Sequence, residues 1–199
     1  MFLTVSEIPK DVGIQRQLTS IHIEEWIKED VFRLRWWLLI GLILIWLFIW
    51  WKAADKSRFH AVCLFAALVT IVTMGINEYG EELTLWDYPT DILPIFPPLS
   101  SINLISLPLI YSIAYQHFKT WKSFIWAVLA ITAVICLVLE PILEWIDFYQ
   151  LLKWKHFYSF PIYVAMVIGI RAAVNKIADI NEKAKNKNQQ NKKQSFHKL

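Results

Sequence analysis

The sequence predicts an all-α membrane protein: a bundle of about five transmembrane helices preceded by an N-terminal amphipathic helix. Of its 199 residues, 56% are hydrophobic and only 19% are charged. The apolar residues come in runs of about fifteen to twenty, the length that a helix needs to cross roughly 30 Å of hydrocarbon. The first run is bracketed by Trp36 and Trp37 at one end and by Trp50 and Trp51 at the other, and tryptophan favours the headgroup zones on both sides of a bilayer.

The chain divides by composition into three parts. Within the N-terminal part, residues 1–17 are expected to be irregular and residues 18–34 helical, with Ile23 and Trp26 on an apolar side. This helix either lies on the membrane surface or is the polar start of the first spanning helix. No basic segment leads into an early apolar run, so the first run is expected to be a retained membrane helix. The parts are residues 1–35, the tail and amphipathic helix; residues 36–177, the bundle; and residues 178–199, a basic, disordered cytoplasmic tail.

Five spanning helices are predicted from the apolar runs, and prolines help to define where the third and the fifth begin. Four prolines between residues 89 and 98 remove backbone donors, so residues 91–98 are expected to be an apolar, non-helical segment, either re-entrant or interfacial. Pro108 should kink the third helix, and Pro161 falls in the first turn of the fifth, where proline is harmless. The predicted spans are residues 36–51, 59–76, 100–116 and 123–139, and a last helix from residue 159 that continues as a polar helix towards residue 181.

Lysine and arginine in the loops predict the orientation. The loops at 52–58 and 117–122 and the tail from Arg171 are basic, whereas the loop at 77–91 has five carboxylates and neither Lys nor Arg. The protein is therefore expected in the cell membrane, with its C-terminus in the cytoplasm and its N-terminus outside. Two lysines in the fourth loop do not fit this assignment. The basic tail should attract anionic lipid headgroups.

Several classes of function find no support in the sequence. There is no nucleophile–base pair, no metal-ligand spacing among the scattered histidines, and no cofactor motif. With five glycines there is little from which to build a phosphate-binding loop. Cys63 and Cys136 lie inside apolar runs and predict neither a disulfide nor a metal site. No catalytic residue, metal or cofactor is therefore predicted, and no folded module indicates binding of nucleic acid.

The stretch LEPILEWIDF, residues 139–148, contains the acids that lie closest to the membrane interior. Glu140, Glu144 and Asp147 are spaced i, i+4, i+7 and would form one stripe on a continued helix. Pro141 leaves the carbonyl of Leu137 without its helical partner, which permits a bend. The stripe is either a solvated outer helix end or a carboxylate cluster that faces a polar pocket between helices.

Partners for the second alternative begin the next helix on the same side of the membrane. An acid at membrane depth is costly unless it is paired, which makes Glu140 a candidate for function. The candidate polar cluster is Glu140 and Glu144 with Lys155, Tyr158 and Tyr163, and His156 is a further plausible partner.

The C-terminal half contains an ordered set of motifs: Tyr115-Gln116, Trp121-Lys122, Glu140-Pro141, Tyr149 and the run WKHFYSFPIY at residues 154–163. With these motifs it resembles an uncharacterised family of small multi-pass membrane proteins found mainly in endospore-forming Gram-positive bacteria. The resemblance covers residues 88–170 and implies location and helical architecture only, because the family has no established activity. It directs attention to Glu140, Trp154, Lys155, Tyr158 and Pro161 as family-type positions.

Three functions are compatible with these features. The first is a non-enzymatic membrane component, either an accessory subunit with a membrane protein partner or a lipid-binding protein. The second is a small transporter or channel that uses intramembrane Glu140. The third is an intramembrane lipid-modifying enzyme with Glu140 as general acid.

Overall fold

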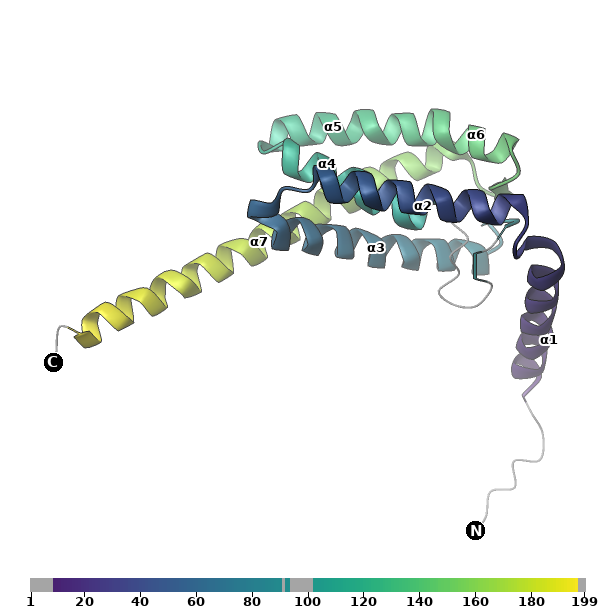
Figure 1. The fold of residues 1–199 in the computed structure, drawn as a ribbon, viewed down its shortest axis with the longest axis horizontal. Coiled ribbons are helices and arrows are strands. Elements are labelled where there is room, and N and C mark those ends of the chain that lie inside the picture. The colour runs from purple at the N-terminus through teal and green to yellow at the C-terminus, as the bar shows by residue number, and fades with distance from the viewer. Residues whose placement is uncertain (1–8, 91, 94–101, 197–199) are drawn as a thin grey trace, which may run out of the picture.

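The computed structural model describes residues 9–90, 92–93 and 102–196, and in these residues the all-α prediction is confirmed (Figure 1). A two-stranded sheet, in which β1 pairs antiparallel with β2, joins two loops at one end of the bundle. The elements are α1 (Lys10–Glu25), η1 (Trp26–Asp30), α2 (Leu34–Ala53), η2 (Lys56–Arg58), α3 (Phe59–Glu82), β1 (Trp86–Asp87), α4 (Ile102–His117), α5 (Trp121–Val134), η3 (Ile135–Leu139), α6 (Glu140–Trp145), β2 (Gln150–Leu151) and α7 (His156–Phe196).

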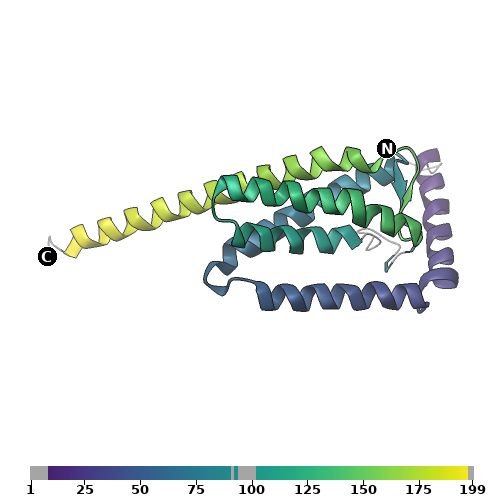
Figure 2. The ribbon, with the colours of Figure 1, turned by 90° about the horizontal axis from the view of Figure 1, so that it is seen from above.

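Four of the five predicted spans are long and apolar enough to cross a membrane in the described part of the chain. They lie within Leu34–Ala53, Lys56–Glu82, Trp121–Trp145 and His156–Lys187. The remaining predicted span, the third in the chain, corresponds to α4. This helix has 16 residues, roughly 24 Å in length, and packs against α2 and α3 inside the bundle (Figure 2). Residues 91 and 94–98 of the predicted non-helical segment lie outside the described residues.

The core lies between α3, α4, α5 and α7. Phe65 of α3 stacks on Tyr115 of α4, with ring centroids 4.6 Å apart, and Phe124 of α5 meets Phe65 edge to face. The hydroxyl groups of Tyr111 and Thr132 form a buried hydrogen bond of 2.8 Å between α4 and α5. In contrast, α2 buries only Leu39. Its exposed apolar side chains, such as Leu44, Ile45 and Phe48, would face lipid in a bilayer, whereas Trp50 donates to the Ser112 hydroxyl of α4.

The N-terminal helix begins earlier than predicted. It starts at Lys10, directly after Pro9, because the residues between Pro9 and residue 18 include no helix-breaking proline. It ends at η1, and Phe32 then turns the chain with a positive φ of 62°. Both views show α1 running crosswise to the bundle at its end (Figure 2), which favours the membrane-surface alternative. None of the residues of α1 is buried.

The last helix is longer than predicted at both ends. It begins at His156, so Pro161 lies beyond the first turn, and it continues to Phe196 in place of the predicted disordered tail. No proline follows Pro161, and the Lys, Gln, Ala and Glu residues of the tail are good helix formers. Figure 1 shows this helix extending well beyond the bundle.

The two ends of the bundle differ in charge. One end, the basic end, contains η2 and the turn between α4 and α5, with basic side chains that include Lys56, Arg58 and Lys119. The other end, the acidic end, contains the last turn of α3, α6 and the sheet, with Glu78, Glu82 and other carboxylates. The charge separation expected from the loops is therefore present in three dimensions.

A cap formed by two loops closes the acidic end. We define this cap as residues 84–90 and 149–154. The register pairs Trp86 with Leu151 and Asp87 with Gln150. The carbonyl oxygen of Leu85 accepts hydrogen bonds from three successive backbone N–H groups, those of residues 152, 153 and 154, at 3.0, 3.0 and 3.2 Å. The Lys153 ammonium also donates to the Thr84 hydroxyl at 2.8 Å. The cap therefore fixes the start of α7 against the end of α3.

Candidate functional site

The backbone at Glu140 departs from a regular helix. The five residues of η3 form a π-helical turn directly before Glu140 and Pro141, which begin α6. Pro141 has no backbone N–H, so the regular i to i−4 hydrogen bonding of the helix is interrupted there. The π-helical turn accommodates one extra residue before this proline. Such turns are frequent at functional sites.

Glu140 is buried, with 1% of its surface exposed. The acidic stripe predicted from the sequence is only partly formed, because α6 ends at Trp145 and Asp147 takes a positive φ of 58°. Asp147 lies 3.6 Å from the Arg35 guanidinium and is exposed. The alternative of a solvated helix end therefore holds for Asp147 but not for Glu140.

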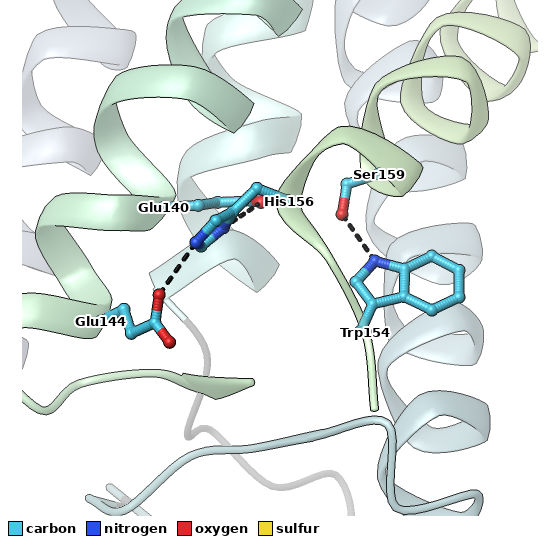
Figure 3. Close-up of polar contacts among 5 residues, drawn as sticks. All are labelled: Glu140, Glu144, Trp154, His156 and Ser159. Atoms are coloured by element: carbon cyan, nitrogen blue, oxygen red, sulfur yellow. Dashed lines mark hydrogen bonds and ion pairs between the residues drawn. The ribbon is translucent and has the colours of Figure 1, made fainter. Parts of the chain in front are cut away.

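His156 lies between the two carboxylates of α6 (Figure 3). Its Nε2 atom is 2.9 Å from Oε2 of Glu144, and its Nδ1 atom is 3.5 Å from Oε2 of Glu140. The longer contact is an ion-pair distance without hydrogen-bond geometry, and neither carboxylate oxygen of Glu140 has a hydrogen-bond partner within the part of the chain that the structure describes. Because His156 is the first residue of α7, this contact joins α6 to α7. We call Glu140, Glu144 and His156 the carboxylate–histidine cluster.

Exposure to water decreases stepwise through this cluster. The side chain of Glu144 is 41% exposed, that of His156 is 22% exposed and that of Glu140 is 1% exposed. The three titratable groups therefore form a short series from the surface of the acidic end to the interior of the bundle. A proton would pass along this series only if Nδ1 of His156 and the Glu140 carboxylate came within hydrogen-bond distance, because their 3.5 Å contact lacks hydrogen-bond geometry.

Aromatic side chains of the cap lie on one side of the cluster. The Tyr149 ring lies 6.4 Å from the His156 ring and 5.4 Å from the Tyr88 ring, between centroids. The Tyr88 hydroxyl donates to Oδ1 of Asn77 at 3.0 Å. Burial raises the pKa of the Tyr149 phenol, and the neighbouring Tyr88, Glu140 and Glu144 raise it further, so Tyr149 stays neutral.

The Trp154 indole holds the segment that leads into α7. Its Nε1 donates to the Ser159 hydroxyl at 3.0 Å (Figure 3), and its ring packs edge to face on Trp86 at 5.3 Å. The cap thus holds the first turn of α7, and with it His156, in position.

The residues predicted for the site divide into two groups. Glu140 and Glu144 come together, and buried Tyr163 lies near Glu140. Lys155 and Tyr158 are exposed and do not join the cluster. Tyr158 instead packs on Trp154, with ring centroids 5.3 Å apart. His156, the further partner considered from the sequence, takes the central place.

A pocket of about 690 Å³ lies beside the cap at the acidic end. It is formed by α1, η1, the end of α3 and β1, so the N-terminal helix contributes to it. Neither Lys nor Arg lines it, and no group of three His, Cys, Asp or Glu side chains that could hold a metal ion occurs among the described residues. Its acidic lining residues are Glu25, Glu29, Asp30, Glu78, Glu81, Glu82 and Asp87.

Comparison with known proteins adds no assignment: no family model matches the chain, and no curated protein or solved structure is significantly similar to it.

Proposed function

We propose that this protein is a non-enzymatic component of the cell membrane that takes up and releases a proton at Glu140 on the outer face. The supporting observation is the carboxylate–histidine cluster, with its decrease in exposure from Glu144 through His156 to Glu140. A change of charge at a buried position can alter how the protein contacts a membrane protein partner. In this proposal the acidic end faces outward and the C-terminus is cytoplasmic, as the basic loops indicate.

The physical argument concerns the cost of a buried charge. An isolated carboxylate is unfavourable in an apolar interior, so it either binds a proton or stays next to a cation. In this cluster the proton can reside on Glu140, which leaves both side chains neutral, or on His156, which leaves an ion pair. The 3.5 Å contact is compatible with either state. Moving the proton therefore changes the charge distribution between α6 and α7.

The surroundings favour a proton over a larger ligand. Glu140 has 1% of its surface exposed and buried Tyr149 and Tyr163 lie near it. A lipid headgroup cannot reach the carboxylate without displacing these side chains, which argues against the alternative of a lipid-modifying enzyme.

Infrared difference spectroscopy during a pH titration tests this proposal on the full chain in lipid nanodiscs. A carbonyl stretching band at the high frequency of a carboxylic acid in an apolar site, separate from the band of the exposed carboxylates, should appear as the pH is lowered and should be absent in Glu140→Gln. The matched control is Glu82→Gln, which removes an exposed carboxylate from the same end and should keep the band. A band that persists in Glu140→Gln, or the absence of any such band in the parent, would contradict the proposal.

A second candidate function is proton-coupled transport of a small cation. The observation in its favour is the pocket of acidic side chains beside the cap, because a cleft lined by one sign of charge concentrates counter-ions. Vesicles that contain the protein and a trapped pH-sensitive dye should then show cation-dependent proton flux, and Glu140→Gln should abolish it. Equal flux for the parent, Glu140→Gln and protein-free vesicles would eliminate this candidate.

A further inference from the structure

A second polar pocket, of about 630 Å³, lies at the basic end of the bundle. It is formed by η2, the start of α3, the end of α4 and the middle of α7. Its lining includes Arg58, Tyr115, Asn175 and Lys176. We propose that Arg58, Asn175 and Lys176 bind a phosphate group in this pocket, which we call the basic pocket, and that an anionic phospholipid headgroup supplies that phosphate.

The polar groups of the basic pocket are arranged as donors. The Tyr115 hydroxyl donates to Oδ1 of Asn175 at 3.3 Å, which occupies the amide oxygen and leaves the amide NH₂ for a ligand. The guanidinium of Arg58 lies 5.5 Å from the centroid of the Tyr115 ring. Guanidinium, ammonium and amide N–H groups are the donors that proteins use to bind phosphate oxygens.

Two guanidinium groups lie close to the Tyr115 ring, and of these Arg58 also interacts electrostatically with Asp55. The Arg171 guanidinium lies 5.8 Å from the Tyr115 centroid. Its two terminal nitrogens donate to the carbonyl oxygens of Phe118 and Lys119 at 2.8 and 2.6 Å, so this guanidinium contributes positive charge next to the pocket without lining it. Among the described residues, neither Arg58 nor Arg171 forms a salt bridge.

Charge balance in the basic pocket therefore favours an anion. Arg58 and Lys176 line the pocket, whereas Asp179 is its single acidic lining residue in the part of the chain that the structure describes. The two guanidinium groups repel each other through a partly apolar medium, and a bound phosphate would offset this repulsion. A cation in the same place would increase it.

An apolar groove adjoining the basic pocket favours a lipid as the source of the phosphate. This groove, of about 300 Å³, is lined mainly by apolar side chains, those of Leu64, Val174 and Ile177, and also by Asn181, Glu182 and Lys185. It shares His60, Ala61 and Ala178 with the basic pocket. A phospholipid could place its phosphate between the cations and part of an acyl chain in the groove. Exposed Trp121 at the pocket is typical of the membrane–water interface.

This inference goes beyond the proposed function and does not depend on it. The basic pocket and the carboxylate–histidine cluster lie at opposite ends of the bundle, so Glu140→Gln should leave phospholipid binding unchanged. Failure of one proposal would therefore leave the other standing.

The test is a titration of the full chain in mild detergent with phosphatidylglycerol, phosphatidylcholine or inorganic phosphate, followed by native mass spectrometry. The parent should bind phosphatidylglycerol in preference to phosphatidylcholine. Arg58→Gln/Lys176→Gln should weaken phosphatidylglycerol binding about thirty-fold, because each cation near a headgroup contributes roughly fivefold. The matched control, Lys52→Gln/Lys122→Gln, removes two cations from the same end outside the pocket and should change binding less than about twofold.

The outcomes separate the sources of phosphate. If inorganic phosphate binds as tightly as phosphatidylglycerol and the pocket variant loses both, the assignment to a lipid is overturned. Equal losses in the pocket variant and the control would show diffuse attraction and overturn the site itself. Arg58→Lys/Lys176→Arg keeps both charges and should retain binding. Loss of binding in this folded, charge-conserving variant would overturn the proposed role of the two cations.

Discussion

Replacing Gly80 with alanine should destabilise the acidic end by about 3 kcal/mol, since forced overpacking and the lost burial of a large aromatic side chain both contribute. A Cβ atom at Gly80 would lie 1.9 Å from Cζ2 of Trp86 and 2.3 Å from Cε2 and Cη2. These distances are far below van der Waals contact, so the indole must move. Trp86 is buried and packs on Trp154, and it cannot move without separating β1 from β2.

The measurement is the unfolding free energy in detergent, together with hydrogen exchange of the cap. We expect Gly80→Ala to unfold at lower denaturant and to exchange faster at residues 84–90 and 149–154. The matched control is Gly75→Ala on the same helix, where nothing lies within 4 Å of the new Cβ. There alanine should be neutral or stabilising by up to about 1 kcal/mol, from helix propensity alone. Equal stability of the two variants would show that Trp86 does not pack on Gly80.

Replacing His156 with alanine should destabilise the protein by about 1–3 kcal/mol, the usual cost of leaving a buried polar group without its partner, because Glu140 can bind a proton instead of keeping an unpaired charge. His156 is the side chain that contacts Glu140 and Glu144 together. Glu140, with 1% of its surface exposed, cannot exchange this contact for water. Glu144 is 41% exposed and can be hydrated, so most of the loss should come from Glu140.

A double-mutant cycle assigns this loss to the pair. Glu140→Gln removes the charge, so His156→Ala should cost less in the Glu140→Gln background than in the parent, with a coupling of about 1–3 kcal/mol. His117→Ala is the control. His117 is exposed at the basic end, and its Nδ1 atom lies 2.9 Å from the carbonyl oxygen of Ile113 in its own helix, so the change should stay within about 0.5 kcal/mol. Additive costs at 140 and 156 in chemical unfolding would contradict an energetic link between them.

The helices could be predicted because their signals are local. The Trp36–Trp37 and Trp50–Trp51 pairs fall near the ends of α2, since the same physical preference governs the sequence and the structure. The sequence indicates Glu140 as a candidate because it is an acid next to a proline at the end of an apolar run. Its burial could not be predicted, because this depends on the π-helical turn of η3 and on the cap.

Which of the predicted residues contacts Glu140 depends on which face of α7 points into the bundle. Ser159, Tyr163, Val167, Ile170 and Val174 are buried at spacings of three and four residues, so they share one face of the helix. One turn before Ser159, the same face of the helix includes His156 but not Lys155 or Tyr158. Because the helix was predicted to begin only at residue 159, the phase of the preceding residues was undefined.

The cap was not predicted because its strands are only two residues long. Pairing of Trp86 with Leu151 joins segments that are distant in sequence, and strands of this length have no periodicity that could indicate them. Tyr88 and Tyr149 were therefore not connected with Glu140. Their position beside it follows from long-range pairing alone.

The single continuous helix from His156 to Phe196 has a mechanical consequence. Tyr163, near Glu140, and Lys176, in the basic pocket, lie on the same rod, roughly 20 Å apart along its axis. No proline occurs among the twelve residues between them. A change in the tilt or rotation of α7 at one end of the bundle should therefore be transmitted to the other end. The helix also continues beyond the bundle, so the same change would move its C-terminal part.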